Sequence, residues 1–327
     1  MTTTDASPRE LIQRTLRGDR AALARAISWV ENELPLAIEV LDACFAASGR
    51  ARRIGITGPP GAGKSTLVTR LARAWRACGE SVAIVAVDPT SPFSGGALLG
   101  DRVRMGELAG DPGVFIRSMA TRGSLGGLAV HTAQVCDVLD AAGFSRILIE
   151  TVGVGQSELE VAQTADSTVV VLVPESGDTV QAMKAGLMEI GDLFVINKAD
   201  REGAERGAYA VRSALELRTA RTDWVPPVVL TVASQGTGVG EVLDQIEAHL
   251  AHLETSGGLQ QRRRERAGQR LHDVLRGRMW LEFRARVPEP EWRQFVERLA
   301  ARELTPDAAA DALMARARDG SGVTPSP

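Results

Sequence analysis

The sequence Gly58-Pro-Pro-Gly-Ala-Gly-Lys-Ser-Thr66 fits the pattern G-x-x-x-x-G-K-[S/T]. An apolar segment at 53–57 with the character of a buried strand precedes it, and residues 67–72 follow with helical spacing. A strand, a glycine-rich loop and a helix in this order form a P-loop, whose backbone N–H groups surround the β-phosphate of a nucleotide. We therefore expect phosphate contacts from Gly61, Ala62, Gly63, Lys64, Ser65 and Thr66. Lys64 should reach the β- and γ-phosphates, and the Ser65 hydroxyl should bind Mg²⁺.

Strands and helices alternate along the chain from residue 53 to residue 254. The expected strands are rich in Val and Ile and apolar on nearly every residue, at 53–57, 81–87, 114–119, 146–151, 168–173, 193–197 and 228–233. Strands of this kind are covered on both faces, and their alternation with helices predicts an α/β fold with a doubly wound, mostly parallel sheet. Ligands of such sheets bind at the carboxyl ends of the strands.

A base-reading motif follows the sixth expected strand, where residues 197–200 read Asn-Lys-Ala-Asp, or N-K-x-D. The Asp200 carboxylate can accept hydrogen bonds from N1–H and from the 2-amino group of guanine, and adenine has neither donor. The Lys198 stem can cover the base, and Asn197 can hold the loop together. The nucleotide is therefore expected to be GTP or GDP. Ala233 ends the next strand, at the place of a short base-contacting loop in GTPases; a loop without ligand contact is the alternative there.

Three acidic residues are candidates for the Mg²⁺ side of the site. Asp88 ends the second expected strand, Asp101 lies further along, and Glu150 follows the fourth strand in an E-x-x-G sequence. Glu150 is longer than the aspartate usual at that position, so we expect it to meet Mg²⁺ through water. A turn cap before proline is the alternative for Asp88, and a solvated helix charge for Asp101. The Gly153 N–H is expected to contact the γ-phosphate.

Val154 follows Gly153, where Ras-like proteins carry a glutamine that orients the attacking water. Valine cannot do this, so the sequence predicts slow intrinsic GTP hydrolysis that requires a group from elsewhere or from a partner. Lys184 and Arg104 are candidates for that group. An ordinary solvated surface cation is the alternative for each of them.

Helical patterns flank the nucleotide domain. We expect a disordered leader at 1–8, a helical extension at 9–50, the nucleotide domain at 51–255, a second helical extension at 256–318 and a disordered tail at 319–327. The basic run at 260–266 is interpreted as a solvated helix face.

Composition limits the partners and the compartment. A net charge of -3 gives no support for nucleic acid as a main partner, and no apolar run approaches the ~20 residues needed to span a membrane. Three isolated cysteines and a polar N-terminus without a signal-peptide core predict a cytoplasmic protein.

These motifs, together with Val87-Asp-Pro-Thr-Ser-Pro92 and Arg117-Ser-Met-Ala-Thr-Arg-Gly123, closely resemble the MeaB/ArgK/MMAA family of P-loop GTPases. This family belongs to the SIMIBI class and consists of chaperones associated with methylmalonyl-CoA mutase. The resemblance covers about residues 10 to 315. It implies phosphate and Mg²⁺ roles for Lys64, Ser65, Asp88, Asp101 and Glu150, and guanine recognition by Asn197, Lys198 and Asp200. Lys184 falls in the segment that resembles the family's additional switch.

The resemblance also implies an assembly and a biological role. It implies a homodimer formed through the C-terminal helical arm, and binding to an adenosylcobalamin-dependent acyl-CoA mutase. GTP binding and hydrolysis would be coupled to cofactor loading and to protection or reactivation of that enzyme. Some relatives carry an older label as amino-acid transport ATPases, which the N-K-x-D sequence opposes.

Other classes make different predictions from the same motifs. A GTP-dependent nickel metallochaperone of the same class predicts a Cys/His metal site, and the sequence contains no such cluster. A module that uses GTP only for structure predicts no turnover with any partner. A small-molecule P-loop kinase predicts a preference for ATP, which Asp200 opposes, and a signal-recognition GTPase predicts a Met-rich module, whereas the seven methionines are scattered.

Overall fold

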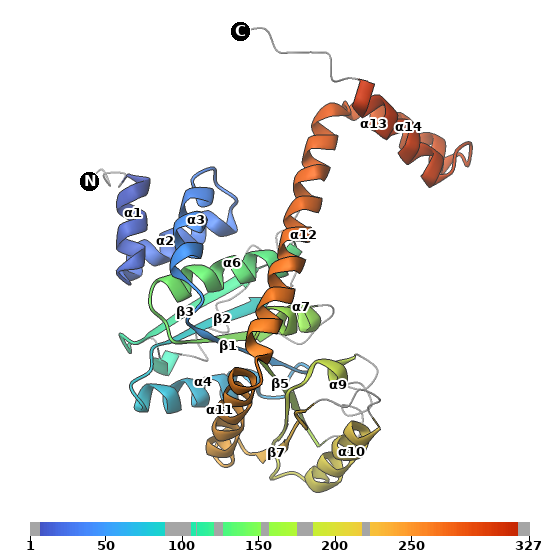
Figure 1. Cartoon of the computed structure of the whole chain (residues 1–327). Helices are drawn as coiled ribbons and strands as arrows, with labels where there is room; N and C mark the ends of the chain where they lie inside the picture. Colours follow the sequence, from blue (N-terminus) through green and yellow to red (C-terminus); the bar gives the residue numbers. More distant parts are fainter. Residues whose placement is uncertain are drawn as a thin grey trace. The chain divides into compact units, whose positions relative to one another are not determined.

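The computed structural model describes residues 7–88, 106–108, 110–120, 127–151, 157–174, 186–217 and 223–319. The chain divides into two compact units, Met1–Ala267 and Gly268–Pro327 (Figure 1). The N-terminal helices belong to the first unit together with the sheet. No helix in the described part of the chain is both long enough and apolar enough to cross a membrane.

The first unit is built on a seven-stranded sheet in the order β3-β2-β4-β1-β5-β6-β7, and every neighbouring pair is parallel. The strands are β1 Arg52–Thr57, β2 Val82–Asp88, β3 Val114–Ala120, β4 Arg146–Thr151, β5 Ser167–Leu172, β6 Leu193–Asn197 and β7 Val228–Thr231. The predicted doubly wound α/β fold is confirmed. β7 ends two residues before its predicted end because Val232 turns back to form an antiparallel bridge with Thr237.

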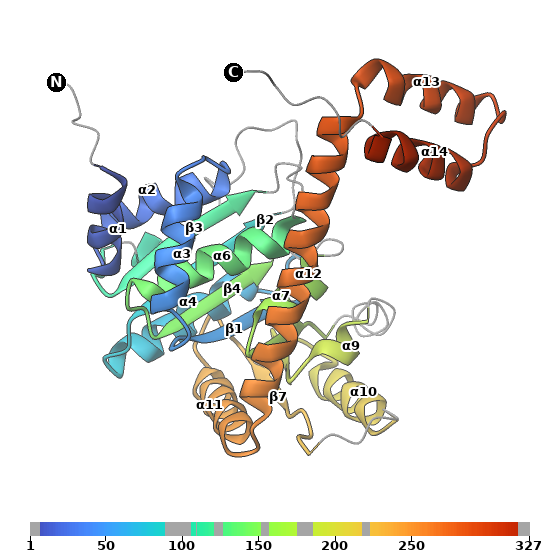
Figure 2. The same cartoon turned by 45° about the horizontal axis from the view of Figure 1, so that its top comes forward.

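Helices cover both faces of the sheet (Figure 2). Helices α4 (Lys64–Ala77) and α11 (Val239–Thr255) pack on one face, against side chains such as Ile54 and Leu148. The opposite face packs against α6 (Gly127–Ala141), α7 (Ser157–Thr164), α9 (Leu187–Ile190) and α10 (Ala204–Glu216). Neighbouring strand residues point to opposite faces, so Leu148 joins the first core while Ile147 and Ile149 join the second. This explains why the strands are apolar throughout.

The N-terminal extension forms three helices, α1 (Pro8–Leu16), α2 (Arg20–Glu31) and α3 (Ala37–Ala47). Ser7 and Asp19 cap the first two, because their side-chain oxygens accept hydrogen bonds from backbone N–H groups in the first turn. The three helices share a buried apolar cluster with α6 and with the sheet. Arg117 of β3 adds a half-buried ion pair with Glu31 of α2.

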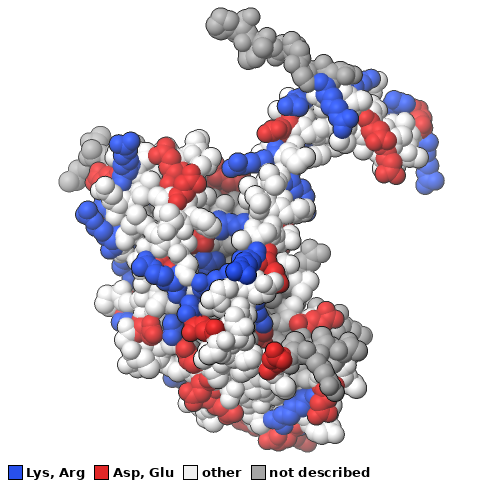
Figure 3. Space-filling model, viewed as in Figure 1, with Lys and Arg blue, Asp and Glu red and all other residues white. Residues whose placement is uncertain are grey.

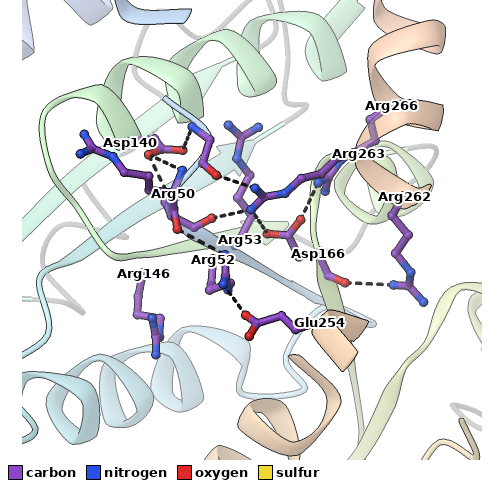
Figure 4. A network of polar contacts seen from close by, with 12 residues as sticks. Arg50, Arg52, Arg53, Asp140, Arg146, Asp166, Glu254, Arg262, Arg263 and Arg266 are labelled. Carbon is purple, nitrogen blue, oxygen red and sulfur yellow. Dashed lines mark hydrogen bonds and ion pairs between the residues drawn. The ribbon is translucent and has the colours of Figure 1, made fainter. Parts of the chain in front are cut away.

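Helix α12 (Gly258–Arg286) begins in the first unit, where its first turns are fixed by ion pairs (Figure 4). Arg262 makes a bidentate pair with Asp192, with N···O distances of 2.7 and 2.9 Å. Arg266 and Arg263 reach Asp166 at 2.5 and 3.6 Å. The interpretation of residues 260–266 as a solvated face is therefore wrong for these three arginines, which hold the helix to the amino ends of β5 and β6. The other four residues of the run are exposed, as expected.

The second unit contains the rest of α12 with α13 (Glu289–Ala300) and α14 (Pro306–Asp319). Its small apolar core is formed by Val287, Phe295, Ala309, Leu313 and Ala317. Arg284 lies over the Trp292 ring, 4.4 Å from its centroid, and also pairs with Glu289. On the face seen in Figure 3, both basic and acidic side chains are exposed.

Candidate nucleotide site

The P-loop connects β1 to α4 and depends on two glycines with positive φ. Gly58 has φ +136°, and a Cβ atom there would lie 2.0 Å from the Val171 carbonyl oxygen of β5. Gly63, at φ +90°, precedes the first residue of α4, and a Cβ atom there would lie 2.3 Å from the Asn197 side-chain nitrogen. Any other residue would push the loop away from β5 or from the N-K-x-D segment.

Lys64 is 5% exposed and is the first residue of α4. Its Nζ donates to the carbonyl oxygens of Gly58 and Pro59 at 2.8 and 2.9 Å. The ammonium group is thus held against the loop at the helix N-terminus, where both the helix dipole and the lysine favour an anion. Of the other predicted loop residues, Ala62 is buried, Gly63 and Ser65 are half-buried, and Gly61 and Thr66 are exposed.

Ser65 and Glu150 lie together although they are 85 residues apart. The Ser65 hydroxyl donates to Glu150 Oε1 at 2.5 Å, and Glu150 is 6% exposed near the carboxyl end of β4. A hydroxyl and a carboxylate are the oxygen ligands that suit Mg²⁺, so these two residues fit the predicted metal role. Asp88 ends β2 beside Ala120 at the same sheet edge. Its side chain, like Asp101, Gly153, Lys184 and Arg104, lies outside the described part of the structure.

Asn197 joins three segments of the site. Its Nδ2 donates to the Ala62 carbonyl at 2.8 Å, and its Oδ1 accepts from Thr231 Oγ1 and from the Ala233 N–H, both at 3.0 Å. The side chain is 3% exposed, so these hydrogen bonds are shielded from water. The P-loop, the N-K-x-D segment and the loop after β7 are therefore fixed to one another, as predicted for the role of Asn197 in tying the loop together.

The remaining residues of the base-reading segment are less buried. Lys198 adopts a left-handed conformation with φ +57°, which turns the chain directly after β6, and Asp200 is exposed. The Ala199 N–H donates to the Thr231 carbonyl at 2.9 Å and fixes this turn to the end of β7. The predicted guanine contacts of Lys198, Asp200 and Ala233 remain predictions.

Sequence reasoning missed two residues of this region. Thr231 is one of the three partners of Asn197, and its position at the end of a strand next to a predicted base loop was the available signal. Arg70 of α4 donates from Nε to the Ala233 carbonyl at 3.2 Å and from Nη2 to the Ser234 carbonyl at 2.6 Å. No sequence pattern pointed to Arg70.

A P-loop that opens a helix with Lys-Ser, fixed by an asparagine to an N-K-x-D turn at the carboxyl edge of a parallel sheet, defines a P-loop GTPase. The family model for "Methylmalonyl Co-A mutase-associated GTPase MeaB" matches residues 23–287. The chain belongs to this family, as the motifs predicted. Members of a GTPase family bind guanine nucleotides, which agrees with the geometry around Asn197.

Two relatives and one solved structure illustrate the similarity. A putative GTPase of Pyrococcus abyssi is 48% identical over 93% of this chain and 95% of the relative. The mouse mitochondrial methylmalonic aciduria type A homolog is 35% identical, over 91% of this chain and 77% of its own length. The crystal structure of a LAO/AO transport system kinase has a TM-score of 0.74 and 30% identity, and the match covers 96% and 98% of the two chains.

Proposed function

We propose that this chain is a GTPase chaperone of an adenosylcobalamin-dependent acyl-CoA mutase, with methylmalonyl-CoA mutase as the first candidate. GTP binding and hydrolysis are coupled in this proposal to loading of the mutase cofactor and to protection or reactivation of the enzyme. The observation that carries it is the family match over residues 23–287, together with the guanine-type arrangement around Asn197.

The chemistry follows from the residues of the loop. Lys64 and the N–H groups at the start of α4 bind the phosphates and stabilise the charge that develops on the γ-phosphate and on the leaving oxygen. Ser65 and Glu150 would hold Mg²⁺ between them, Glu150 through water, and Asp88 and Asp101 complete the proposed acidic set. The ion would neutralise phosphate charge when bound. The Gly153 N–H senses the γ-phosphate in this proposal.

Intrinsic hydrolysis is proposed to be slow and to rise when the partner binds. Val154 occupies the position of the water-orienting glutamine of Ras-like proteins, so this chain has no side-chain amide at that position to orient the attacking water. Lys184 is the proposed source of the additional positive charge. A partner that places this lysine at the γ-phosphate would raise the turnover number without changing the base-reading residues.

The proposed homodimer uses the second helical extension. Leu271, Leu275 and Met279 recur every four residues along α12 and are 61%, 49% and 68% exposed. Apolar side chains at this spacing form one stripe of a helix, and such a stripe is ordinarily buried by another helix. A second copy of α12 would supply the same stripe under two-fold symmetry.

The experiment is GTP turnover by the purified chain, alone and with a purified adenosylcobalamin-dependent methylmalonyl-CoA mutase. Slow basal turnover that rises at least about tenfold with the mutase is expected, since partner-supplied groups have effects of this size or larger. Lys184→Ala should reduce the stimulated rate and leave the basal rate and GDP affinity close to wild type. Turnover that no such mutase changes would refute the proposed partnership while leaving the GTPase assignment intact.

A further inference from the structure

Arg70 contacts the loop after β7 through two consecutive carbonyl groups, and no motif of the chain accounts for it. It lies on α4, six residues after Lys64, and is half-buried. Its guanidinium donates hydrogen bonds to the backbone carbonyl oxygens of Ala233 at 3.2 Å and Ser234 at 2.6 Å. The Ala233 N–H donates to the side chain of Asn197. We propose that Arg70 is a positioning residue for the guanine base, acting through the peptide between Ala233 and Ser234. This inference rests on the proposed binding of guanine nucleotides.

The peptide unit between Ala233 and Ser234 is planar. The Ala233 carbonyl and the Ser234 N–H belong to one trans peptide unit, so they point in opposite directions. The Arg70 guanidinium and the Gly236 N–H both donate to this carbonyl, and groups that fix the carbonyl also fix the direction of the N–H. The positive charge on the carbonyl side further polarises the peptide and strengthens the N–H as a donor.

The Ser234 N–H is distinctive within its turn. The Ala233 N–H donates to Oδ1 of Asn197. The Gln235 N–H donates to the Val232 carbonyl oxygen at 2.9 Å, and the Gly236 N–H donates to the Ala233 carbonyl oxygen at 3.2 Å. Among the described residues, the Ser234 N–H has no hydrogen-bond acceptor. Its loop adjoins the N-K-x-D turn through the hydrogen bond from Ala199 to Thr231, so this oriented donor lies beside the segment that carries Asp200.

Such a donor matches guanine and opposes adenine. Guanine carries an acceptor, O6, at the position where adenine carries an amino donor. A fixed N–H donor can bind O6 of guanine. With adenine the same N–H would face the amino group, so two donors would meet without an acceptor. Arg70 would thus add discrimination at position 6 of the base to that of Asp200 at N1 and at the 2-amino group. It touches no nucleotide atom in this account and acts only through the peptide.

A purely structural role for Arg70 makes a different prediction, and a modified base separates the two. In 6-thio-GDP a sulfur replaces O6, and sulfur is a weaker hydrogen-bond acceptor, while N1–H and the 2-amino group remain available to Asp200. Loss of a positioned donor should weaken GDP more than 6-thio-GDP. A general loosening of the loop should weaken both nucleotides by the same factor.

The test measures the dissociation constants of GDP and 6-thio-GDP by calorimetry for the full chain and three variants. Arg70→Ala should raise the GDP dissociation constant about tenfold and the 6-thio-GDP constant no more than about twofold. The ratio of the 6-thio-GDP constant to the GDP constant should therefore fall by about fivefold or more. Arg70→Lys, which keeps the charge and one donor direction, should recover part of the ratio. Arg73→Ala is the matched control, because Arg73 lies on the same helix, is 42% exposed and pairs with Glu107. It should change neither constant.

Two results would overturn the proposal for Arg70. One is an unchanged ratio in both Arg70 variants, whether the two constants rise together or stay as in the wild type. The other is a wild-type chain that binds no GDP, which would refute the proposed guanine binding as well. Binding of GDP with an unchanged ratio refutes only the role of Arg70, so the two failures are distinguishable.

Discussion

Asp166 offers the sharpest test of how the first unit is held together, through the substitution Asp166→Asn. The carboxyl group is 0% exposed and lies just before β5. It accepts the Arg53 N–H at 2.9 Å and pairs with Arg266 at 2.5 Å and Arg263 at 3.6 Å (Figure 4). Asparagine keeps the shape and removes the charge, which leaves the guanidinium groups of α12 next to a neutral amide.

The magnitude follows from burial of the group. Removing one partner of a buried ion pair typically costs about 3–5 kcal/mol, because the other charge is left without compensation. The side chains of Arg263 and Arg266 are 30% and 20% exposed and can recover some hydration, which favours the lower end. We expect a loss of about 3 kcal/mol in the free energy of unfolding at neutral pH. For a unit of this size the midpoint temperature should fall by roughly 6–12 °C.

The pH dependence gives a second signature of the same interaction. Burial raises the pKa of Asp166, but Arg266 and Arg263 lower it more, so the pKa lies below its ordinary value. A lowered pKa means that the stabilisation is complete above the unfolded value of about 3.9 and is lost as the pH falls through the folded value. The difference between wild type and Asp166→Asn should therefore be constant from pH 5 to 8 and shrink in more acidic solution.

The assay is urea unfolding followed by circular dichroism, with Asp244→Asn as a control of identical chemistry. Asp244 is exposed on α11, so its substitution should change the free energy of unfolding by less than about 0.5 kcal/mol. A loss below about 1 kcal/mol for Asp166→Asn would refute the reasoning, since it would place this ion pair among ordinary surface pairs. A loss that stays the same in acid would refute the assignment to the carboxylate charge.

Three further predictions concern the site, the core and the second unit. Gly63→Ala should weaken GDP binding at least about tenfold in a fluorescence titration, because its Cβ would lie 2.3 Å from the side-chain nitrogen of Asn197; unchanged affinity would show that the loop and Asn197 can separate freely. Burial lowers the pKa of His249 to about 4. The stability that comes from keeping this histidine neutral should therefore be fully present above pH 6.5 and fall by about 3 kcal/mol towards pH 4. His249→Gln should flatten this pH dependence of the free energy of unfolding in urea titrations. Leu275→Glu should shift the chain from dimer to monomer in sedimentation equilibrium without changing GDP affinity; a wild-type monomer would contradict the proposed arm.

Much of the fold was predictable because local signals agree with the tertiary structure. The strands are apolar on both faces, the helices between them have regular spacing, and Gly18-Asp19 and Leu34-Pro35 separate the N-terminal helices as breakers should. The P-loop and the N-K-x-D segment were recognisable because each needs particular residue types at fixed spacing. Their meeting at Asn197 followed from the topology of a parallel sheet, whose carboxyl ends share one edge.

Other features depend on contacts between distant residues and leave no local pattern. Arg262, Arg263 and Arg266 have the sequence character of a solvated helix face, and only folding brings them to Asp166 and Asp192. Arg70 likewise resembles any polar residue of a helix until the loop after β7 is placed beside it. The partner of a charged side chain cannot be predicted from the sequence, because an arginine at a given position of a helix can face either water or a buried carboxylate.

The most direct test of the guanine assignment is turnover of GTP, ATP and XTP by the wild type and by Asp200→Asn. Xanthine carries an oxygen where guanine carries its 2-amino group, and an asparagine amide can donate to that oxygen whereas a carboxylate cannot. We predict that the wild type hydrolyses GTP in preference to ATP and XTP by at least about a hundredfold, and that Asp200→Asn prefers XTP. Equal turnover of GTP and ATP by the wild type, or a variant that keeps its preference for GTP, would contradict the reading of guanine by Asp200.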